Sequence, residues 1–433
     1  MKTQLAYGRR HLPVELPPDA EELSGAGARP LADPSAAAAS ALRRPLGTPS
    51  LAELAGGRHH ACVVVSDITR PVPYGVLLPP LLAELESRVE RLTVLVATGT
   101  HRATTPAEKE EMLGPDVAAR HEVVDHDSRD EAQLVGLPGR TSSGLAPRVN
   151  RLYVEADLKV LTGLVEPHFM AGYSGGRKAV FPGLSDLRSI QRFHGPGFLE
   201  DPRAASGVLE GNPCHREACE VARLAGADFT VNVAMNVDRR LVGVFAGELD
   251  AAFQAAVAKV DATCRAEAEP ADVVVTSGGG YPLDATFYQT VKGMVGALAV
   301  VRQGGAVLIA SACSEGVGNR AYAELMFRYA GRHQQFRRDI QARCEVVQDQ
   351  WEFEEQCKVL DRVGVEGLVV CTEGIPRATL ERLSVTPAAA LCDEADVAAR
   401  LQGALDALLR ARPGARVVAI PQGPYVLATR RRR

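Results

Sequence analysis

The stretch "ACVVVSDITRP", residues 61–71, joins a run of apolar, mostly β-branched residues directly to a polar segment. The same arrangement returns in "LTVLVATGTHR" (92–102) and in "LKVLTGLVEPH" (158–168). Continuous apolar runs of this length are typical of strands that are buried on both faces of a parallel sheet. Comparable runs occupy residues 271–282, 305–313, 366–374 and 416–424.

Helical patterns lie between these strands, at 78–90, 215–225, 250–268, 319–331 and 393–411. Strands that alternate with helices predict an α/β fold with mainly parallel sheets. The length of 433 residues favours more than one domain. A long helix gives way to a new strand near residues 268–271, so we expect an N-terminal α/β domain over 1–269 and a C-terminal α/β domain over 270–411. The cleft between two such domains is the expected place for an active site.

The composition excludes several classes of partner. The net charge is −4 with both signs mixed along the chain, which predicts no nucleic-acid or anionic-membrane surface. No apolar run approaches the roughly 20 residues that span a bilayer, and the N-terminus lacks the apolar core of a signal peptide. The nine cysteines are scattered without a CxxC pair, and "NPCHREAC" (212–219) matches no common zinc pattern. These features favour free thiols in a cytoplasmic protein.

Polar residues follow two of the predicted strands. Asp67 and Arg70 come directly after the first strand, and His101 follows Gly99 at the end of the next. Ligands bind beyond the carboxyl ends of the strands in parallel sheets. Arg70 can bind a carboxylate or a phosphate through two hydrogen bonds, or pair with Asp67 in a turn.

The segment "EPHFMAGYSGGRK" (166–178) carries the densest cluster of reactive side chains. Gly175 and Gly176 provide a backbone able to wrap a phosphate through its N–H groups, and Ser174 adds a hydroxyl donor. Lys178 supplies a charge or a nucleophilic amine. The segment lacks the GxxxxGK[ST] pattern of a Walker motif.

Two further histidines and a second glycine loop complete the candidates. His168 lies in the same segment, and His194 ends a predicted helix for which we expect Ser185 as the N-cap. Imidazole serves as a metal ligand or as a proton shuttle. In "SGGGYPLDATFYQTVKG" (277–293), a helix would place Tyr288 and Lys292 on one face, with Gln289 beside them. Such a face suits a small carboxylate substrate, or is a solvated helix start. Trp351 on its own indicates packing.

Together these stretches resemble the nickel-dependent lactate racemase family, which also holds related 2-hydroxy-acid racemases and epimerases. The resemblance runs from "YGRRHLPVELP" (7–17) to about residue 425, so it covers nearly the whole chain. No single motif decides it, but the order and spacing of the set are specific. The motifs are "DITRP" (67–71), "GTHR" (99–102), "PHFMAGYSGGRK" (167–178), the helix ending in His194, "YQTVK" (288–292) and "DQW" (349–351).

The resemblance implies a nickel-pincer nucleotide, a pyridinium-3-thioamide-5-thiocarboxylate mononucleotide with nickel, made by separate cofactor-synthesis and nickel-insertion enzymes. Lys178 would hold it covalently, and His194 would ligate the nickel. His101 and His168 would be the paired acid/base residues. The other implied roles are cofactor binding by Asp67, Arg70, Ser174, Gly175 and Gly176, and substrate binding by Arg70, Tyr288, Gln289, Lys292 and Trp351. It further implies that residues 412–433 return to the N-terminal domain.

The expected reaction is racemisation or epimerisation of a 2-hydroxy acid, lactate or a related 2-hydroxycarboxylate, by reversible hydride transfer to that cofactor. A proton-transfer racemase, or a metal-binding protein of the same fold without racemase activity, would carry many of the same residues. A nicotinamide-dependent dehydrogenase should show GxGxxG at a strand end, which we do not find. A zinc hydrolase should show an HxH or HExxH pair, which is also missing. Arg177 and Met170 have no assigned role; Arg177 could neutralise a phosphate or tune substrate choice.

Overall fold

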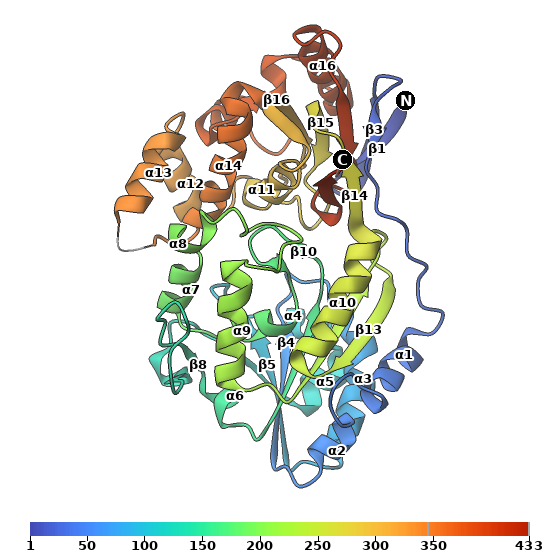
Figure 1. Ribbon diagram of the computed structural model, residues 1–433, viewed down its shortest axis with the longest axis vertical. Coiled ribbons are helices and arrows are strands. Elements are labelled where there is room, and N and C mark those ends of the chain that lie inside the picture. The colour runs from blue at the N-terminus through green and yellow to red at the C-terminus, as the bar shows by residue number, and fades with distance from the viewer. Residues whose placement is uncertain (344–345, 432–433) are drawn as a thin grey trace. The chain divides into compact units, whose positions relative to one another are not determined.

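The structure, a computed structural model, describes residues 1–343 and 346–431 and divides into two compact units. Unit 1 comprises Met1–Gly27 and Cys264–Arg433, and unit 2 comprises Ala28–Thr263 (Figure 1). Each unit is built on its own six-stranded sheet.

The sheet of unit 2 has the strand order β13-β12-β9-β4-β5-β6. All neighbours pair in parallel except β12 and β13, which are antiparallel. The first and second stretches quoted from the sequence form β4 and β5, and the third forms β9. The strands are β4 (His60–Ser66), β5 (Arg91–Ala97), β6 (Glu122–Asp125), β9 (Leu158–Leu164), β12 (Phe229–Met235) and β13 (Leu241–Gly247).

Apolar residues from helices and from the sheet form one continuous core in unit 2. Leu42 of α1 (Pro34–Arg43), Leu51 of α2 (Leu51–Ala55) and Leu78 of α3 (Tyr74–Glu86) pack with Val63 and Val94 of the sheet. This packing explains why residues 61–65 of β4 and 94–97 of β5 are apolar. The remaining elements of unit 2 used below are β10 (Pro167–His168), β11 (Gly172–Tyr173), η2 (Gly176–Ala179), α5 (Pro115–Arg120), α7 (Leu187–Phe193), α9 (Pro213–Ala225) and α10 (Leu249–Cys264).

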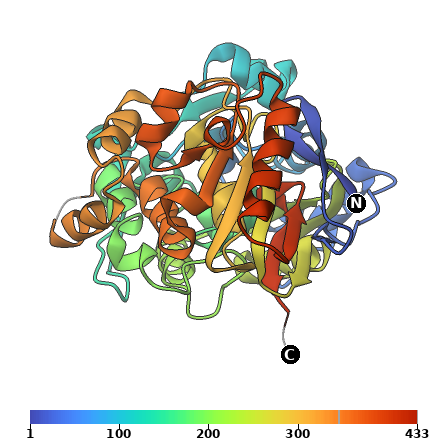
Figure 2. The same cartoon turned by 90° about the horizontal axis from the view of Figure 1, so that it is seen from above.

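The sheet of unit 1 has the order β18-β17-β16-β15-β19-β3 and is parallel throughout. Its strands are β3 (Glu21–Glu22), β15 (Ala271–Ser277), β16 (Val301–Ala310), β17 (Leu368–Cys371), β18 (Thr386–Pro387) and β19 (Val417–Ile420). Val274 and Ile309 pack with α11 (Phe287–Gly296) and α14 (Gln350–Gly367) on one face. Val275 and Leu308 pack with α16 (Val397–Arg410) and the hairpin of β1 (Lys2–Tyr7) and β2 (Arg10–Glu15) on the other. Figure 2 shows this sheet with helices on both sides.

The two units differ from the expected domains at both ends of the chain. Residues 412–433 were expected to rejoin the N-terminal domain, but β19 pairs with β15 and β3 inside the sheet of unit 1. β20 (Leu427–Arg430) likewise pairs with β14 (Arg265–Ala268). The N-terminal hairpin also packs on this sheet, so the first 27 residues and the tail both complete the unit that begins at Cys264. The reason is that β19 and the hairpin bury apolar side chains of β15 and β16 that α11 and α14 leave uncovered.

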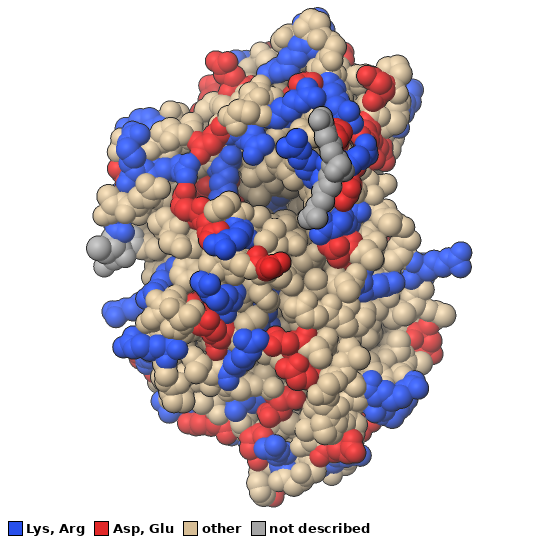
Figure 3. All heavy atoms as spheres, viewed as in Figure 1, with Lys and Arg blue, Asp and Glu red and all other residues tan. Residues whose placement is uncertain are grey.

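Positive and negative side chains are interspersed on the face drawn in Figure 3, as the mixed charge pattern of the sequence predicts. Within the described part of the chain, no helix combines the length and the apolarity that crossing a membrane would require.

Candidate functional site

The predicted site residues of unit 2 lie in loops that leave three adjacent strands. Strand β4 lies between β9 and β5. Asp67 and Arg70 follow β4, His101 follows β5, and His168 follows β9. Because parallel strands end at the same edge, these loops all emerge at one edge of the sheet, where ligands bind in α/β folds.

Asp67 and His101 form a direct pair across this edge. His101 Nδ1 lies 2.5 Å from Asp67 Oδ2, and the hydroxyl of Thr69 donates to Asp67 Oδ1 at 2.6 Å. Burial works to raise the pKa of Asp67, but hydrogen bonds from His101 and Thr69, with the charge of Arg70, hold it below its ordinary value. The carboxylate is therefore ionised and accepts Nδ1–H, so the neutral ring of His101 presents its lone pair at Nε2. The His101 side chain is 49% exposed, which leaves it accessible to a ligand.

Arg70 belongs to the turn that Asp67 begins. Its backbone N–H donates to Asp67 O at 3.1 Å, and its side chain is half-buried. The turn thus keeps Arg70, which is three positions after Asp67 in the sequence, close to the Asp67–His101 pair. No hydrogen bond between the Arg70 guanidinium and Asp67 is needed to form this turn, since backbone groups close it.

His168 lies on the short hairpin of β10 and β11, which returns the chain to the end of β9. The backbone N–H groups of Met170 and Ala171 point at its Nδ1, at 3.2 and 3.3 Å. Both contacts point an N–H donor at Nδ1 and so fix the direction of the ring. The ring also stacks on Phe169, with centroids 5.2 Å apart. The backbone thus engages Nδ1 of His168, and Nε2 is in contact with Lys178.

Lys178 lies in η2 and contacts His168 of β10. Its Nζ lies 2.9 Å from His168 Nε2. The contact places the amine of Lys178, a potential nucleophile, beside an imidazole that can exchange protons with it. The two residues that the sequence placed ten positions apart are thus brought together by the hairpin.

The glycines of this loop are required by close packing. A Cβ on Gly175 would lie 2.7 Å from Val165 Cγ2, and one on Gly176 would lie 3.0 Å from the ring of Phe253; both glycines have a positive φ. The N–H of Gly176 donates to Asn232 Oδ1 at 2.9 Å. That N–H is therefore engaged within the protein, which differs from the expected phosphate cradle.

The hydroxyl of Ser174 likewise forms hydrogen bonds within the protein. Its hydroxyl donates to Leu164 O at 2.7 Å and accepts from Glu166 N at 3.0 Å. A serine has one hydroxyl proton, and here that proton ties the loop to the end of β9. Ser174 thus holds the hairpin against the sheet.

His194 follows α7, whose N-cap is Asp186 and not the expected Ser185. Asp186 Oδ1 accepts from Ser189 N at 3.1 Å, whereas Ser185 is fully buried and its hydroxyl donates to Val180 O. His194 Nδ1 donates to Ile190 O at 2.9 Å, which leaves a lone pair on Nε2. Burial, together with the nearby charge of Lys178, lowers the pKa of His194 to about 3. His194 is therefore a neutral imidazole near Lys178, and neutral imidazole is a common ligand of transition metals.

Backbone hydrogen bonds connect the loop of the Asp67–His101 pair with the segment of the His168–Lys178 pair. Gly99 N donates to Gly183 O at 3.0 Å, and Gly183 N donates to Lys178 O at 3.2 Å. His101 N closes the adjoining turn by donating to Thr98 O at 3.0 Å. The loop of His101 and the segment of Lys178 are thus directly connected in the fold.

The predicted substrate residues of unit 1 lie on α11 and at the start of α14. The hydroxyl of Tyr288 accepts from Trp351 Nε1 at 2.9 Å and donates to Asp349 Oδ1 at 3.3 Å. Trp351 thus orients Tyr288 in addition to packing. Burial raises the pKa of Tyr288 well above its ordinary value, so it is a neutral phenol. Gln289 and Lys292 follow on the same helix, as predicted, and Gln289 Oε1 is a buried acceptor with no hydrogen bond from any described residue.

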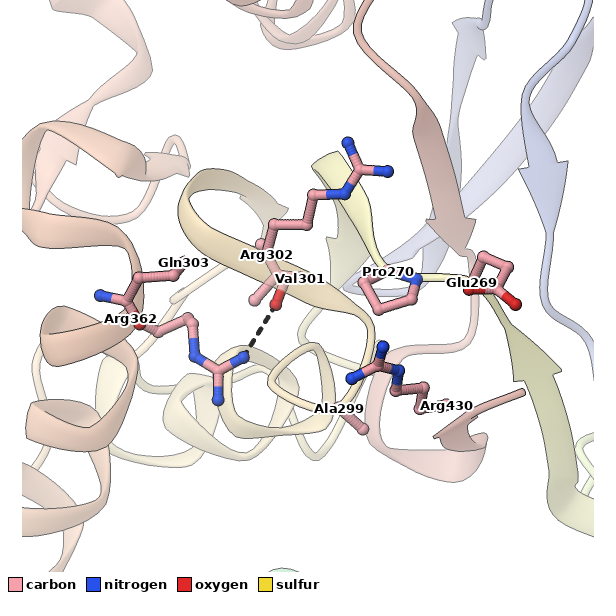
Figure 4. Close-up of a pocket in the computed structure, with 8 residues that line it drawn as sticks. All are labelled: Glu269, Pro270, Ala299, Val301, Arg302, Gln303, Arg362 and Arg430. Carbon is pink, nitrogen blue, oxygen red and sulfur yellow. Dashed lines mark hydrogen bonds between the residues drawn. The ribbon is translucent and has the colours of Figure 1, made fainter. Parts of the chain in front are cut away.

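A pocket of about 350 Å³ in unit 1 lies elsewhere. Its lining comes from residues that precede β15 and begin β16, including Pro270, Arg302 and Gln303, together with Arg362 and Arg430 (Figure 4). This is the amino-terminal edge of the parallel strands, opposite the edge at which such sheets bind ligands. Arg362 is engaged there with Val301 O at 3.0 Å. We therefore do not assign this pocket to the candidate site.

"NPCHREAC" has the structural role that its spacing predicts. Asn212 caps α9 by accepting from Cys214 N and His215 N, and its amide donates to Met170 O at 2.9 Å. Cys214 and Cys219 are buried and form no disulfide. Among residues 1–343 and 346–431, no three His, Cys, Asp or Glu side chains group as a metal site would require.

Two residues that brace the site escaped the sequence reasoning. Asn232 accepts from Gly176 N, and the sequence carries a signal for it, because Asn232 places a fully buried amide in the mainly apolar strand "FTVNVAM". Asp349 has a left-handed backbone conformation and accepts hydrogen bonds from both Tyr288 and Asn319. No local sequence pattern indicates that role.

Comparisons with known proteins place the whole chain in one family. The lactate racemase N-terminal domain model matches residues 7–207, and the lactate racemase C-terminal domain model matches residues 266–427. A lactate racemase of Thermoanaerobacterium thermosaccharolyticum is 38% identical over 324 residues, which cover 74% of this chain and 76% of that protein. A lactate racemase of Lactiplantibacillus plantarum is 37% identical over 283 residues, covering 65% and 66% of the two chains.

Solved structures agree with the sequence matches. The structure of the lactate racemase apoprotein from T. thermosaccharolyticum superposes with a TM-score of 0.89 at 33% identity, over 99% of this chain and 100% of that chain. A structural-genomics crystal structure of a Thermotoga maritima protein superposes with a TM-score of 0.67 at 17% identity, over 92% and 99%, which shows a shared fold only. The matched domains, the identity over most of the chain and the shared architecture together show that this chain belongs to the lactate racemase family of isomerases.

Proposed function

We propose that this protein racemises or epimerises a 2-hydroxy acid, lactate or a related 2-hydroxycarboxylate, with a lysine-tethered nickel-pincer pyridinium mononucleotide as its cofactor. The observation that carries the proposal is the Lys178 Nζ to His168 Nε2 distance of 2.9 Å beside a neutral His194. It combines a nucleophilic amine, an acid/base imidazole and a metal ligand in one place. The family membership supports the same conclusion.

The residues present fit such a cofactor. A thioamide to Lys178 needs a primary amine, which Lys178 supplies in η2, 2.9 Å from the imidazole of His168. A nickel ion already held by the sulfur-bearing arms of the cofactor needs few protein ligands, and His194 offers one imidazole whose ring is fixed by Ile190 O. When bound, this group supplies a two-electron sink that takes the C2 hydrogen as hydride and gives it back.

The protein side of the reaction is proton movement at the substrate hydroxyl. Loss of hydride from C2 makes a keto acid only if the hydroxyl proton leaves with it. His101 Nε2 is suited to take that proton, because the Asp67 carboxylate stabilises the imidazolium that results. His168 is the second imidazole, so that one base serves each enantiomer. His168 acts through Nε2, because the backbone N–H groups of Met170 and Ala171 engage its Nδ1.

Substrate binding is the proposed task of Arg70, Tyr288, Gln289, Lys292 and Trp351. The cations of Arg70 and Lys292 suit a carboxylate. Tyr288 donates its own proton to Asp349 and accepts from Trp351, so its oxygen is oriented to accept a further hydrogen bond. Gln289 Oε1 is a second acceptor, and both suit a substrate hydroxyl.

Covalent attachment of the cofactor to Lys178 tests this proposal. Protein produced together with cofactor-synthesis and nickel-insertion enzymes should gain a covalent adduct, which peptide mass spectrometry maps to Lys178. Lys178→Ala should lose both adduct and racemisation, while Lys259→Ala, a change on α10, should keep both. An adduct on another lysine would refute the tether; racemisation by adduct-free protein would favour a proton-transfer racemase. An adduct without racemisation of any 2-hydroxy acid would favour a binding protein.

A further inference from the structure

Arg177 is almost completely buried directly beside the lysine of the site. Only 1% of it is exposed. Its Nη2 donates to Ala171 O at 2.9 Å, and its Nη1 lies 3.3 Å from Gly175 O and 3.4 Å from Ser174 O. One guanidinium thus binds three carbonyl groups of the loop between His168 and Lys178.

The surroundings of this cation are unusual for a buried charge. Its guanidinium lies over the Phe253 ring, 4.2 Å from the centroid, and its Nε has no hydrogen-bond partner among the described residues. Burial lowers the pKa of Arg177 to about 10, which still leaves it charged at neutral pH. A desolvated guanidinium with an unsatisfied N–H is costly. An apolar side chain would fill the same space more cheaply, so packing alone does not account for Arg177.

The carbonyls that Arg177 binds belong to the residues that hold the two reactive groups. Ala171 donates its N–H to His168 Nδ1 and accepts from Arg177 through its carbonyl. Ser174 and Gly175 lead into η2, where Gly175 O also accepts from Lys178 N at 3.1 Å. Arg177 therefore connects the end of the hairpin that orients His168 to the start of the turn that carries Lys178.

We propose that Arg177 is a positioning residue that sets the contact between His168 Nε2 and Lys178 Nζ. The planar fork of arginine reaches several carbonyls at once, which the single ammonium of lysine does not. The side chain is turned inward, so Arg177 acts through the loop and touches neither substrate nor cofactor. The consequence for catalysis rests on the proposed function; the positioning itself does not.

The positioning is testable on protein without cofactor. Lys178 is acylated with N-hydroxysuccinimidyl acetate at a fixed pH, and peptide mass spectrometry gives its labelling rate relative to Lys259 in the same molecule. Arg177→Lys and Arg177→Met are compared with Arg188→Lys, a change at an exposed arginine of α7. We expect the Lys178 to Lys259 ratio to change in both Arg177 variants and to stay at the wild-type value in Arg188→Lys. Arg177→Lys keeps charge and approximate size, so it decides the question should Arg177→Met fail to fold.

A second readout uses the cofactor-loaded enzyme. Misplacing a reacting group by about 1 Å can lower kcat by up to about 100-fold, so Arg177→Lys should lower kcat by about tenfold or more with KM unchanged. A wild-type labelling ratio in Arg177→Lys would overturn the proposal, whatever the activity. A raised KM with unchanged kcat would also overturn it, because it would show a direct role in substrate binding. Failure of the proposed function would leave the labelling result standing.

Discussion

His101 Nδ1 lies 2.5 Å from Asp67 Oδ2, and the two residues follow the neighbouring strands β5 and β4. The carboxylate is buried, ionised and also held by Thr69, so it fixes both the tautomer and the direction of the imidazole. The same orientation of a histidine by a buried carboxylate makes it an effective general base in hydrolases. Here the contact engages Nδ1 of His101, so the ring can act on a ligand only through Nε2.

Replacing Asp67 by Asn should therefore damage catalysis while leaving the fold intact. The amide can donate to Nδ1, which would favour the wrong tautomer of His101 and remove the charge that stabilises the imidazolium. We expect kcat to fall by about 100-fold to 10,000-fold, with KM changed little. Racemisation followed by chiral chromatography measures this, and Asp116→Asn, an exposed change on α5, is the control. Wild-type kcat in Asp67→Asn would remove His101 from the role of base.

His194→Ala should lose nickel and keep its fold. The variant removes the one imidazole whose Nε2 is held unprotonated by burial and by the bond from Nδ1 to Ile190 O. Elemental analysis of protein produced with the cofactor enzymes gives the metal content, and His59→Ala, at a largely exposed histidine, should keep it. Equal nickel content in the two variants would move the metal ligand elsewhere.

Arg70→Ala and Lys292→Ala test the carboxylate anchor. Truncating one partner of a buried, hydrogen-bonded charge pair costs about 2–5 kcal/mol, so whichever residue binds the substrate carboxylate should lose orders of magnitude in kcat/KM. Arg88→Ala, a change at the end of α3 where Arg88 pairs with Glu84, should have no such effect. Near-normal kcat/KM in both test variants would exclude both cations as the anchor.

His126 should make the protein less stable in mild acid. It is buried, its Nε2 donates to Ser185 O at 3.0 Å and its Nδ1 accepts from Asn150 Nδ2 at 3.1 Å, so the fold holds it neutral. Burial lowers the pKa of His126 below its ordinary value of about 6.5. As the pH falls below about 6.5, the unfolded chain binds a proton that folded His126 does not, so the free energy of unfolding decreases.

The urea midpoint at pH 7 and pH 5 measures this effect. His126→Gln is less stable at pH 7 but lacks the titration, so its midpoint should fall less between the two pH values than that of the wild type. An equal fall in both proteins would show that His126 does not contribute to the acid sensitivity.

Much of the fold follows from the sequence because buried parallel strands have a direct signature. The runs quoted at 61–71, 92–102 and 158–168 became β4, β5 and β9, and the reactive residues do lie at their carboxyl ends. The ends of the helices were harder to predict. Helix α3 was expected to begin at residue 78, but it begins at Tyr74 and carries Pro79 and Pro80 in its interior. Proline is favoured in the first turn of a helix and disfavoured in its interior, so a helix that begins one turn before Pro79 is not expected from local preferences.

The parts that could not be predicted depend on contacts between distant segments. Nothing in a local pattern shows that Gly176 donates to Asn232, that Ser174 braces β9 or that Arg177 turns inward. A glycine-rich loop looks the same whether its N–H groups face a phosphate or a neighbouring strand. The placement of the tail in unit 1 likewise depends on which strand edge is open, and single-sequence reasoning does not reveal that.

The most direct test of the account is the fate of the hydrogen on C2. Cofactor-loaded protein is given lactate deuterated at C2 in ordinary water, and mass spectrometry measures the label in the racemised product. Hydride transfer keeps that hydrogen out of exchange with water, whereas a proton abstracted by His101 or His168 mixes with it. The account predicts that the product of inverted configuration retains its deuterium, and that His101→Ala and His168→Ala form none of it. Loss of the deuterium during racemisation would contradict the account and establish a two-base proton mechanism.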